Sequence, residues 1–168
     1  MSRTTENLKA AFAGESQANR RYLAFAKKAE KEGYTRVARL FRAAAEAETV
    51  HAHAHLAALN GVGATAANLK EAIAGETHEF TSMYPEMIAQ AQQEGEKTAL
   101  RSFTLANEVE KIHAGLYEKA LAMLADESYA KADTAYYVCS ICGYTCEDAA
   151  PETCPVCKAK AQAFTKVA

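Results

Sequence analysis

The 168-residue sequence has no tryptophan, no strong excess of charge of either sign and no long apolar run. A net charge of −2 gives no general electrostatic basis for binding nucleic acid. No apolar segment approaches the roughly 18 residues of a membrane-spanning helix, and the first residues lack the apolar stretch of a signal peptide. We therefore expect a cytoplasmic protein, long enough for one ordinary domain plus a small module.

Most of the chain has the pattern of long helices. Apolar residues make up 49% of the sequence, and the abundance of alanine favours helices that pack closely. Helical periodicity runs roughly over residues 5–31, 35–59, 67–94 and 97–125. The first three stretches end at Gly33, at the pair Asn60-Gly61 and at Gly95. Pro85 interrupts the third stretch, so we expect a kink or a local irregularity there.

The helical part is an internal repeat, whose offset changes from 61 to 62 residues along the chain. Glu15 corresponds to Glu76 at the first offset, whereas Glu48 corresponds to Glu110 at the second. Each repeat is a helix hairpin, and neither hairpin alone could bury its carboxylates. Two hairpins around a pseudo-twofold axis predict a four-helix bundle over residues 1–130, followed by a second domain over residues 131–168.

Each repeat contains a Glu-x-x-His motif, preceded by a glutamate on the partner helix. Residues i and i+3 share one face of a helix, so both side chains of the motif point the same way. One such motif is weak evidence, but two at matching positions are the pattern of a carboxylate-bridged two-metal site. The predicted ligands are Glu15, Glu48, His51, Glu76, Glu110 and His113.

Carboxylates gathered in a bundle core repel one another and lose hydration, and two cations offset both effects. Imidazole suits ferrous iron, although the ligand types alone also admit manganese or a mixed iron–zinc pair. Glu48 and Glu110, on the motif helices, are the natural bridging ligands. Glu15 and Glu76 are then the natural terminal ligands.

Three further side chains are open to two interpretations. Glu79 shares a helix face with Glu76, and it is either a surface residue or a redox-dependent ligand that alternates with His51. The first repeat has Ala18 at the matching offset, so this carboxylate breaks the symmetry. Tyr22 and Tyr84 follow Glu15 and Glu76 by seven and eight residues, and are either core tyrosines or residues that face the metals.

The last part of the chain contains two Cys-x-x-Cys pairs, Cys139 with Cys142 and Cys154 with Cys157. Each pair forms a tight turn, which brings two thiolates to one ion. Four thiolates in tetrahedral arrangement suit zinc or iron, so the spacing predicts a single-metal site without naming the metal. Cys146 lies between the pairs, and we interpret it as a bystander.

The link between the second and third helices is short. Residues 60–66 span at most about 20–25 Å when extended, whereas the helices they join are about 35–40 Å long. A full-length crossover within one chain is therefore excluded. Either the bundle is a simple up-and-down one, or two chains exchange hairpins in a domain-swapped homodimer, which we take as the hypothesis.

With these motifs in place, nearly the whole chain resembles the rubrerythrin family. The resemblance rests on the segments AFAGESQANRRY, AEAETVHAHAH, AGETHEFTSMYPEM, ANEVEKIHAGLY and CSICGYT…APETCPVC. It implies a ferritin-like four-helix domain with a di-iron site, followed by a rubredoxin-like module with one iron instead of zinc. By this resemblance Glu79 joins the six ligands, the exchange of Glu for His involves Glu79 and His51, and Tyr22 and Tyr84 are site tyrosines.

The family's activity implies an enzyme that reduces hydrogen peroxide to water in oxidative stress defence. Its electrons come from a reductase or a rubredoxin, and ultimately from NAD(P)H. A ferroxidase or iron-handling protein, and a non-catalytic electron carrier, are the alternatives. Two departures from rubredoxin-like modules concern loop conformation: Asp148 stands where glycine is frequent, and Lys158-Ala159-Lys160 replaces a proline-rich segment.

Overall fold

A computed structural model describes residues 2–167 of the chain. It consists of two compact units, the first ending at Gly63 and the second beginning at Ala64. None of the helices in the described part is long and apolar enough to cross a membrane.

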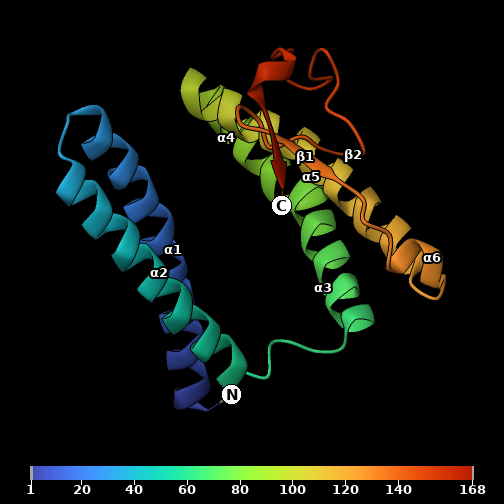
Figure 1. The fold of residues 1–168 in the computed structure, drawn as a ribbon, viewed down its shortest axis with the longest axis horizontal. Helices are drawn as coiled ribbons and strands as arrows, with labels where there is room; N and C mark the ends of the chain where they lie inside the picture. The colour runs from blue at the N-terminus through green and yellow to red at the C-terminus, as the bar shows by residue number, and fades with distance from the viewer. Residues whose placement is uncertain (1, 168) are drawn as a thin grey trace. The chain divides into compact units, whose positions relative to one another are not determined.

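The first unit is a hairpin of two helices, α1 (Arg3–Lys31) and α2 (Thr35–Ala58), which lie side by side in Figure 1. Ala38, Ala45 and Ala52 follow one another at intervals of seven residues and are all buried. Such small side chains let two helix backbones approach closely. Asn19 joins the helices further, because its amide donates to the Ala45 carbonyl at 2.7 Å and to Thr49 Oγ1 at 2.9 Å.

The second unit begins with α3 (Thr65–His78), a π-helical turn η1 (Glu79–Met83) and α4 (Tyr84–Glu94), and these pack along α5 (Lys97–Met123). These bounds confirm the helices expected from periodicity to within a few residues. Gly33 and Gly95 have φ angles of 83° and 73° and end their helices as predicted. At the end of α2, where the stop was predicted at Asn60-Gly61, Asn60 takes the left-handed conformation, with φ 53°.

The irregularity expected near Pro85 is the π-turn η1, which lies just before it. Proline has no N–H to donate to the carbonyl four residues earlier, and Pro85 is instead placed in the first turn of α4. A π-helical turn has i→i+5 hydrogen bonds, so it contains one residue more than a turn of α-helix. The extra residue lies between Glu76 and Tyr84, where the repeat offset changes from 61 to 62.

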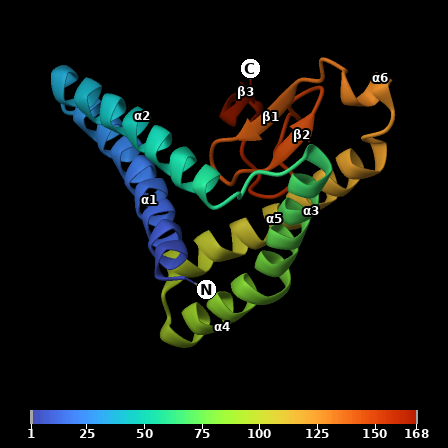
Figure 2. The same cartoon turned by 90° about the horizontal axis from the view of Figure 1, so that it is seen from below.

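The rest of the second unit is a small sheet in the order β2-β1-β3, with both pairs antiparallel. Its strands are β1 (Tyr136–Cys139), β2 (Thr145–Glu147) and β3 (Phe164–Val167), and a 3₁₀ turn η2 (Ala161–Ala163) leads into β3. Figure 2 shows the three strands grouped near α5. The segment between α5 and β1 contains a one-turn helix α6 (Glu127–Ala130), because Asp126 caps it by accepting from the Ser128 N–H at 2.9 Å.

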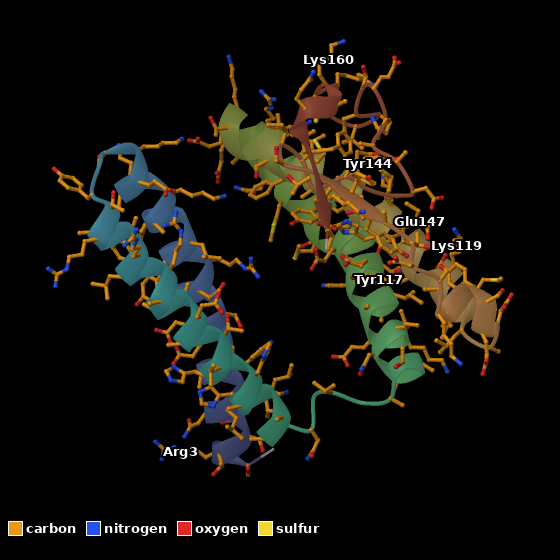
Figure 3. All side chains as sticks on the ribbon, viewed as in Figure 1. Arg3, Tyr117, Lys119, Tyr144, Glu147 and Lys160 are labelled. Atoms are coloured by element: carbon orange, nitrogen blue, oxygen red, sulfur yellow. The ribbon has the colours of Figure 1, made fainter. Side chains whose placement is uncertain are left out.

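The sheet region contacts α5 through an ion pair with aromatic side chains beside it, and through one buried apolar side chain. Lys119 on α5 and Glu147 on β2 form an ion pair, and the two residues lie next to each other in Figure 3. The Tyr136 hydroxyl donates to Glu147 at 3.2 Å, and the Lys119 ammonium lies 5.6 Å from the centre of the Tyr129 ring. Val109 of α5 is buried, and its side chain lies beneath Gly143.

Candidate metal centres

The first half-site consists of Glu15 from α1 and Glu48 and His51 from α2. One ligand atom from each of these residues lies within 4.8 Å of the other two. The i, i+3 spacing on α2 brings His51 Nδ1 to 2.8 Å from Glu48 Oε2. The hairpin of the first unit therefore places the three predicted ligands of the first repeat together.

The second half-site repeats this arrangement with Glu76 from α3 and Glu110 and His113 from α5. His113 Nδ1 lies 2.8 Å from Glu110 Oε2 and 3.9 Å from Glu76 Oε1. The Glu-x-x-His motifs of the two repeats thus have the same local geometry. Each half-site provides two carboxylates and one imidazole, a donor set that suits a hard or borderline divalent cation such as ferrous iron.

The second half-site is electrostatically unfavourable without a cation. Burial and the neighbouring Glu110 carboxylate raise the pKa of Glu76, and Glu79 raises it further. Two nearby carboxylates in a partly desolvated place compete for protons, because ionising both costs Coulomb energy. A bound cation removes this conflict, so the residues present fit the metal pair that the motif predicts.

The π-turn places Glu79 and Tyr84 near the second half-site. Burial raises the pKa of the Tyr84 hydroxyl, and the carboxylates of Glu79, Glu110 and Glu76 raise it further. Glu79 therefore lies close enough to act electrostatically on both Glu76 and Tyr84, although it is not within the tight cluster of the half-site. This arrangement favours the interpretation of Glu79 as more than a surface residue.

The two tyrosines occupy matching places in the two repeats. The Tyr22 ring lies 6.1 Å from the Phe41 ring, and the Tyr84 ring lies 6.3 Å from the Phe103 ring, with similar tilts of 35° and 39°. Both pairs are related by the offset of 62 residues. The π-turn thus contains the extra residue of the second repeat. Tyr84 therefore occupies the same position in the second unit that Tyr22 occupies in the first.

The four cysteines expected to bind one ion form a single cluster. Cys139 Sγ lies 3.6 Å from Cys157 Sγ, and Cys142 Sγ lies 3.6 Å from Cys154 Sγ. A tetrahedron with metal–sulfur bonds of 2.3 Å has edges of about 3.8 Å, so the cluster fits a tetrathiolate ion and no disulfide is formed. Cys146 does not join the cluster, and its thiol points to the Ala149 carbonyl at 3.4 Å.

The thiols of the cluster differ in how readily they ionise. Burial raises the pKa of Cys139, but backbone N–H groups of Ile141 and Cys142 outweigh it and lower that pKa to about 7. Burial and the neighbouring thiols raise the pKa of Cys142 to about 12. One thiolate therefore forms near neutral pH, and binding an ion must displace the protons that remain on the others.

Sequence patterns did not single out Thr145 or Asn19. Thr145 Oγ1 lies 3.0 Å from His113 Nε2, and Asn19 links α1 to α2 one turn from the first half-site. Thr145 is three residues from Cys142, the last residue of the first Cys-x-x-Cys pair, so its place in the module was evident. Its partner was not, because the contact joins residues 32 positions apart.

Comparisons with known proteins agree with this geometry. The family model described as Rubrerythrin matches residues 6–121, and the one described as Rubrerythrin, rubredoxin-like domain matches residues 137–165. Nigerythrin of Nitratidesulfovibrio vulgaris is 40% identical over 96% of this chain and 85% of its own length. Rubrerythrin-2 of Clostridium acetobutylicum is 37% identical, over 96% of this chain and 95% of its own.

A solved structure agrees with these family matches. The structure titled fully reduced state of nigerythrin (all ferrous) is similar with a TM-score of 0.59 and 35% identity, over 99% of this chain and 88% of that one. The helices and half-sites described above are those of a ferritin-like domain, and the cysteine cluster is that of a rubredoxin-like module. The chain therefore belongs to the rubrerythrin family, with a di-iron site and a separate one-iron site.

Proposed function

We propose that this protein is a non-haem di-iron peroxidase that reduces hydrogen peroxide to water and serves in oxidative stress defence. The observation that supports this most directly is the asymmetry of the two half-sites. The second repeat has an additional carboxylate, Glu79, on a π-turn beside Glu76 and Tyr84, and the first repeat has no counterpart. A symmetric ligand set would suffice to hold two ions, so the extra carboxylate favours a site whose ligands change during turnover.

The six half-site residues are proposed to hold the two irons. Glu48 and Glu110 would bridge the ions, Glu15 and Glu76 would bind one ion each, and the imidazoles of His51 and His113 would complete the set. When bound, a pair of ferrous ions supplies the two electrons that, with two protons, reduce hydrogen peroxide to two water molecules. The task of the surrounding residues is to hold the ligands, to place the substrate and to supply hydrogen bonds.

Glu79 and His51 are proposed to alternate as ligands. A carboxylate oxygen prefers the harder ferric ion, whereas imidazole suits the ferrous ion. The His51 side chain is 56% exposed, and its one polar contact within the described residues is to Glu48. It therefore has the freedom to leave and return that such an exchange requires.

Tyr84 is proposed to donate a hydrogen bond to the substrate, and Tyr22 to do the same from the first unit. Because burial and three carboxylates raise the pKa of Tyr84, its hydroxyl stays protonated in the neutral pH range. A protonated phenol can donate to a peroxide oxygen as negative charge develops there. The matching Tyr22–Phe41 and Tyr84–Phe103 pairs hold the two rings in similar places within their units.

The rubredoxin-like module is proposed to deliver electrons from a reductase, or from a separate rubredoxin, with NAD(P)H as the source. We accordingly divide the chain functionally into residues 1–130, which hold the di-iron site, and residues 131–168, which hold one iron. A structural ion would not need to be redox-active. Iron in a tetrathiolate site changes oxidation state, whereas zinc does not.

The homodimer is proposed to be domain-swapped. Only residues 59–64 separate α2 from α3, and they span at most about 20–25 Å. A helix of 24 residues, the length of α2, is about 36 Å long. We infer that a complete two-metal site combines the first half-site of one chain with the second half-site of its partner.

Anaerobic stopped flow tests the peroxidase proposal. The fully reduced, iron-loaded protein is mixed separately with hydrogen peroxide and with oxygen, and the colour of the ferric cysteine site is followed. We expect fast oxidation by peroxide and slow oxidation by oxygen. Faster reaction with oxygen would support a ferroxidase instead, and the absence of the ferric colour would remove the electron-transfer role of the module.

Two matched pairs of variants sharpen this test. Glu79→Gln should slow oxidation by peroxide, whereas Glu86→Gln, an exposed glutamate of α4, should leave the rate unchanged. Cys154→Ser should abolish peroxide turnover that is driven by NAD(P)H and a reductase, whereas Cys146→Ser should retain it. Equal rates within either pair would contradict the role assigned to Glu79 or to the cysteine site.

A further inference from the structure

Both ring nitrogens of His113 have a polar neighbour. On one side, Nδ1 faces the Glu110 carboxylate at 2.8 Å. On the other, Nε2 lies 3.0 Å from the hydroxyl of Thr145 on β2 of the rubredoxin-like module. The same hydroxyl lies 3.0 Å from the carbonyl of Gly143, which can only accept a hydrogen bond.

The Gly143 carbonyl fixes the direction of both hydrogen bonds of the Thr145 hydroxyl. A hydroxyl has one proton, and Thr145 uses it to donate to the Gly143 carbonyl. Toward His113 the hydroxyl must therefore accept, so the proton of the imidazole lies on Nε2. In the neutral ring the lone pair then lies on Nδ1, the nitrogen that faces the carboxylates of the second half-site.

His51 differs from His113 in this respect. Its Nδ1 has the same contact with the motif glutamate, at 2.8 Å. Among the residues that the structure describes, however, no side chain is hydrogen-bonded to its Nε2, and its side chain is 56% exposed against 26% for His113. Within the described residues, one imidazole thus has polar contacts at both ring nitrogens and the other has one at Nδ1 alone.

We propose that Thr145 is a positioning residue for the second half-site. Its hydroxyl holds His113 in the tautomer and orientation that present Nδ1 to a metal ion, and this makes the second half-site the rigid one. The rubredoxin-like module therefore has a structural role in metal binding by the helices, apart from any electrons it delivers. The inference rests on the proposed ligand role of His113, and it does not depend on which oxidant the protein reduces.

Proton exchange at the imidazoles reports on this hydrogen bond directly. A cavity of about 300 Å³ borders both His113 and Thr145, and the His113 side chain is 26% exposed, so water has access to the imidazole. Slow exchange of its Nε2 proton would then reflect the hydrogen bond and not burial alone. In the full-length protein with zinc at all its metal sites, ¹H–¹⁵N spectra distinguish the ring protons of His113 and His51.

We expect the Nε2 proton of His113 to exchange with water at least tenfold more slowly than that of His51. Thr145→Val removes the hydroxyl at nearly constant volume and should abolish this difference, whereas Thr145→Ser keeps the hydroxyl and should retain it. Zinc affinity of the second half-site, measured by chelator competition, should fall about 10-fold or more in Thr145→Val and stay within about twofold in Thr145→Ser. The zinc content of the cysteine site shows that the module is folded in each variant.

Three results would overturn the inference. Equal exchange at His113 and His51 in the unmodified protein would exclude the hydrogen bond without any substitution. An unchanged affinity in Thr145→Val, or an equal loss in Thr145→Ser, would show that the hydroxyl is not the cause. Zinc bound by the cysteines alone would overturn the ligand role of His113 and this inference with it, so the two failures are distinguishable.

Discussion

The two Cys-x-x-Cys turns of the rubredoxin-like module have the same backbone conformation. A different residue follows the second cysteine of each turn. Gly143 follows Cys142 with a φ of 87°, and its N–H donates to the Cys139 carbonyl at 2.8 Å. Lys158 follows Cys157 with a φ of 64°, and its N–H donates to the Cys154 carbonyl at 3.0 Å. The left-handed conformation is easy for glycine and costs other residues about 1–2 kcal/mol.

Lys158→Gly is therefore predicted to stabilise the module by about 1 kcal/mol. Lys158→Ala is the matched control, because it removes the same lysine side chain, including its 2.7 Å hydrogen bond to the Pro155 carbonyl, without relieving the backbone. Denaturant unfolding followed at the iron colour should show a higher midpoint for the glycine variant and an unchanged or lower one for the alanine variant. A lower midpoint for Lys158→Gly would contradict the argument.

Glu76 has a pKa above its ordinary value in the metal-free protein, mainly because of burial and then because of Glu110. Between the unfolded and the folded pKa, the folded chain binds more protons than the unfolded chain does. The free energy of unfolding therefore falls as the pH rises through this window, and the whole penalty is present above the folded pKa. At neutral pH the carboxylate cluster destabilises the metal-free protein, and a bound cation reverses the effect.

Glu76→Gln is predicted to stabilise the metal-free protein at pH 7 relative to the unmodified chain, and to lose that advantage as the pH falls below the ordinary value of 4.5. Urea unfolding between pH 4 and pH 8 measures the difference. Glu71→Gln, an exposed glutamate on the same helix, serves as the control and should show no such pH-dependent gain. Added ferrous iron should favour the unmodified protein over Glu76→Gln.

At the scale of elements, the π-turn η1 joins two observations that the sequence presents separately. The repeat offset changes from 61 to 62, and the second repeat has a carboxylate with no counterpart in the first. One inserted residue explains the change of offset, because a π-turn accommodates it without shifting the helix that follows, and the additional carboxylate, Glu79, is the first residue of that turn. The matching Tyr22–Phe41 and Tyr84–Phe103 pairs show that the two repeats are in register again from Tyr84 onward.

Deleting Ser82, an exposed residue of η1, is predicted to turn the segment into a continuous α-helix. The spacing from Glu76 to Tyr84 then becomes the seven residues found between Glu15 and Tyr22, so the protein should fold and still bind two irons in its helices. Peroxide reduction should fall at least tenfold, because Glu79 loses its special placement.

Deleting Gln90, an exposed residue of α4, is the matched control. No π-turn lies there to absorb the loss, so the face of α4 beyond the deletion turns by about 100° relative to α5. Circular dichroism melts should show a clear loss of stability for this deletion and little for that of Ser82. Equal destabilisation by the two deletions would contradict the insertion model.

Periodicity and glycine stops predicted the long helices because each one repeats its signal over many turns. The one-turn helix α6 escaped prediction because four residues have no period, and only the capping contact of Asp126 defines it. The sequence predicted the stop after α2 at Asn60-Gly61 but could not choose between the two residues, since asparagine and glycine both tolerate the left-handed conformation. The ligand clusters followed from i, i+3 spacing, whereas the Thr145–His113 contact depends on how the sheet meets α5 and has no local signal.

At the scale of the whole molecule, neither of the two units is sufficient by itself for the predicted two-metal site. Each unit contains one complete half-site, and a two-metal site requires one of each. The six residues between α2 and α3 are too short for a full crossover along a helix of this length. The proposed domain-swapped dimer would satisfy both conditions, because the partner chain would then supply the second half-site.

Mixed dimers distinguish swapped from unswapped sites. Glu48→Ala inactivates the first half-site and Glu110→Ala the second, so each variant alone should bind no iron pair in its helices. In a swapped dimer of the two variants, one site combines both defects and the other has neither. Co-expression with two affinity tags should therefore restore about half of the helical iron and of the peroxide turnover. Unswapped chains should restore none, since each would retain one defect.

The reverse arrangement is the control, and its outcome is opposite. When the double variant Glu48→Ala/Glu110→Ala is paired with the unmodified chain, both sites of a swapped dimer have one defect, and no iron pair should bind. Unswapped chains would keep one intact site and about half of the iron. Because the two pairings contain the same substitutions, they differ only in which chain has them, and folding defects cannot imitate the crossed result. Restoration in this second pairing, with none in the first, would place each complete site within a single chain.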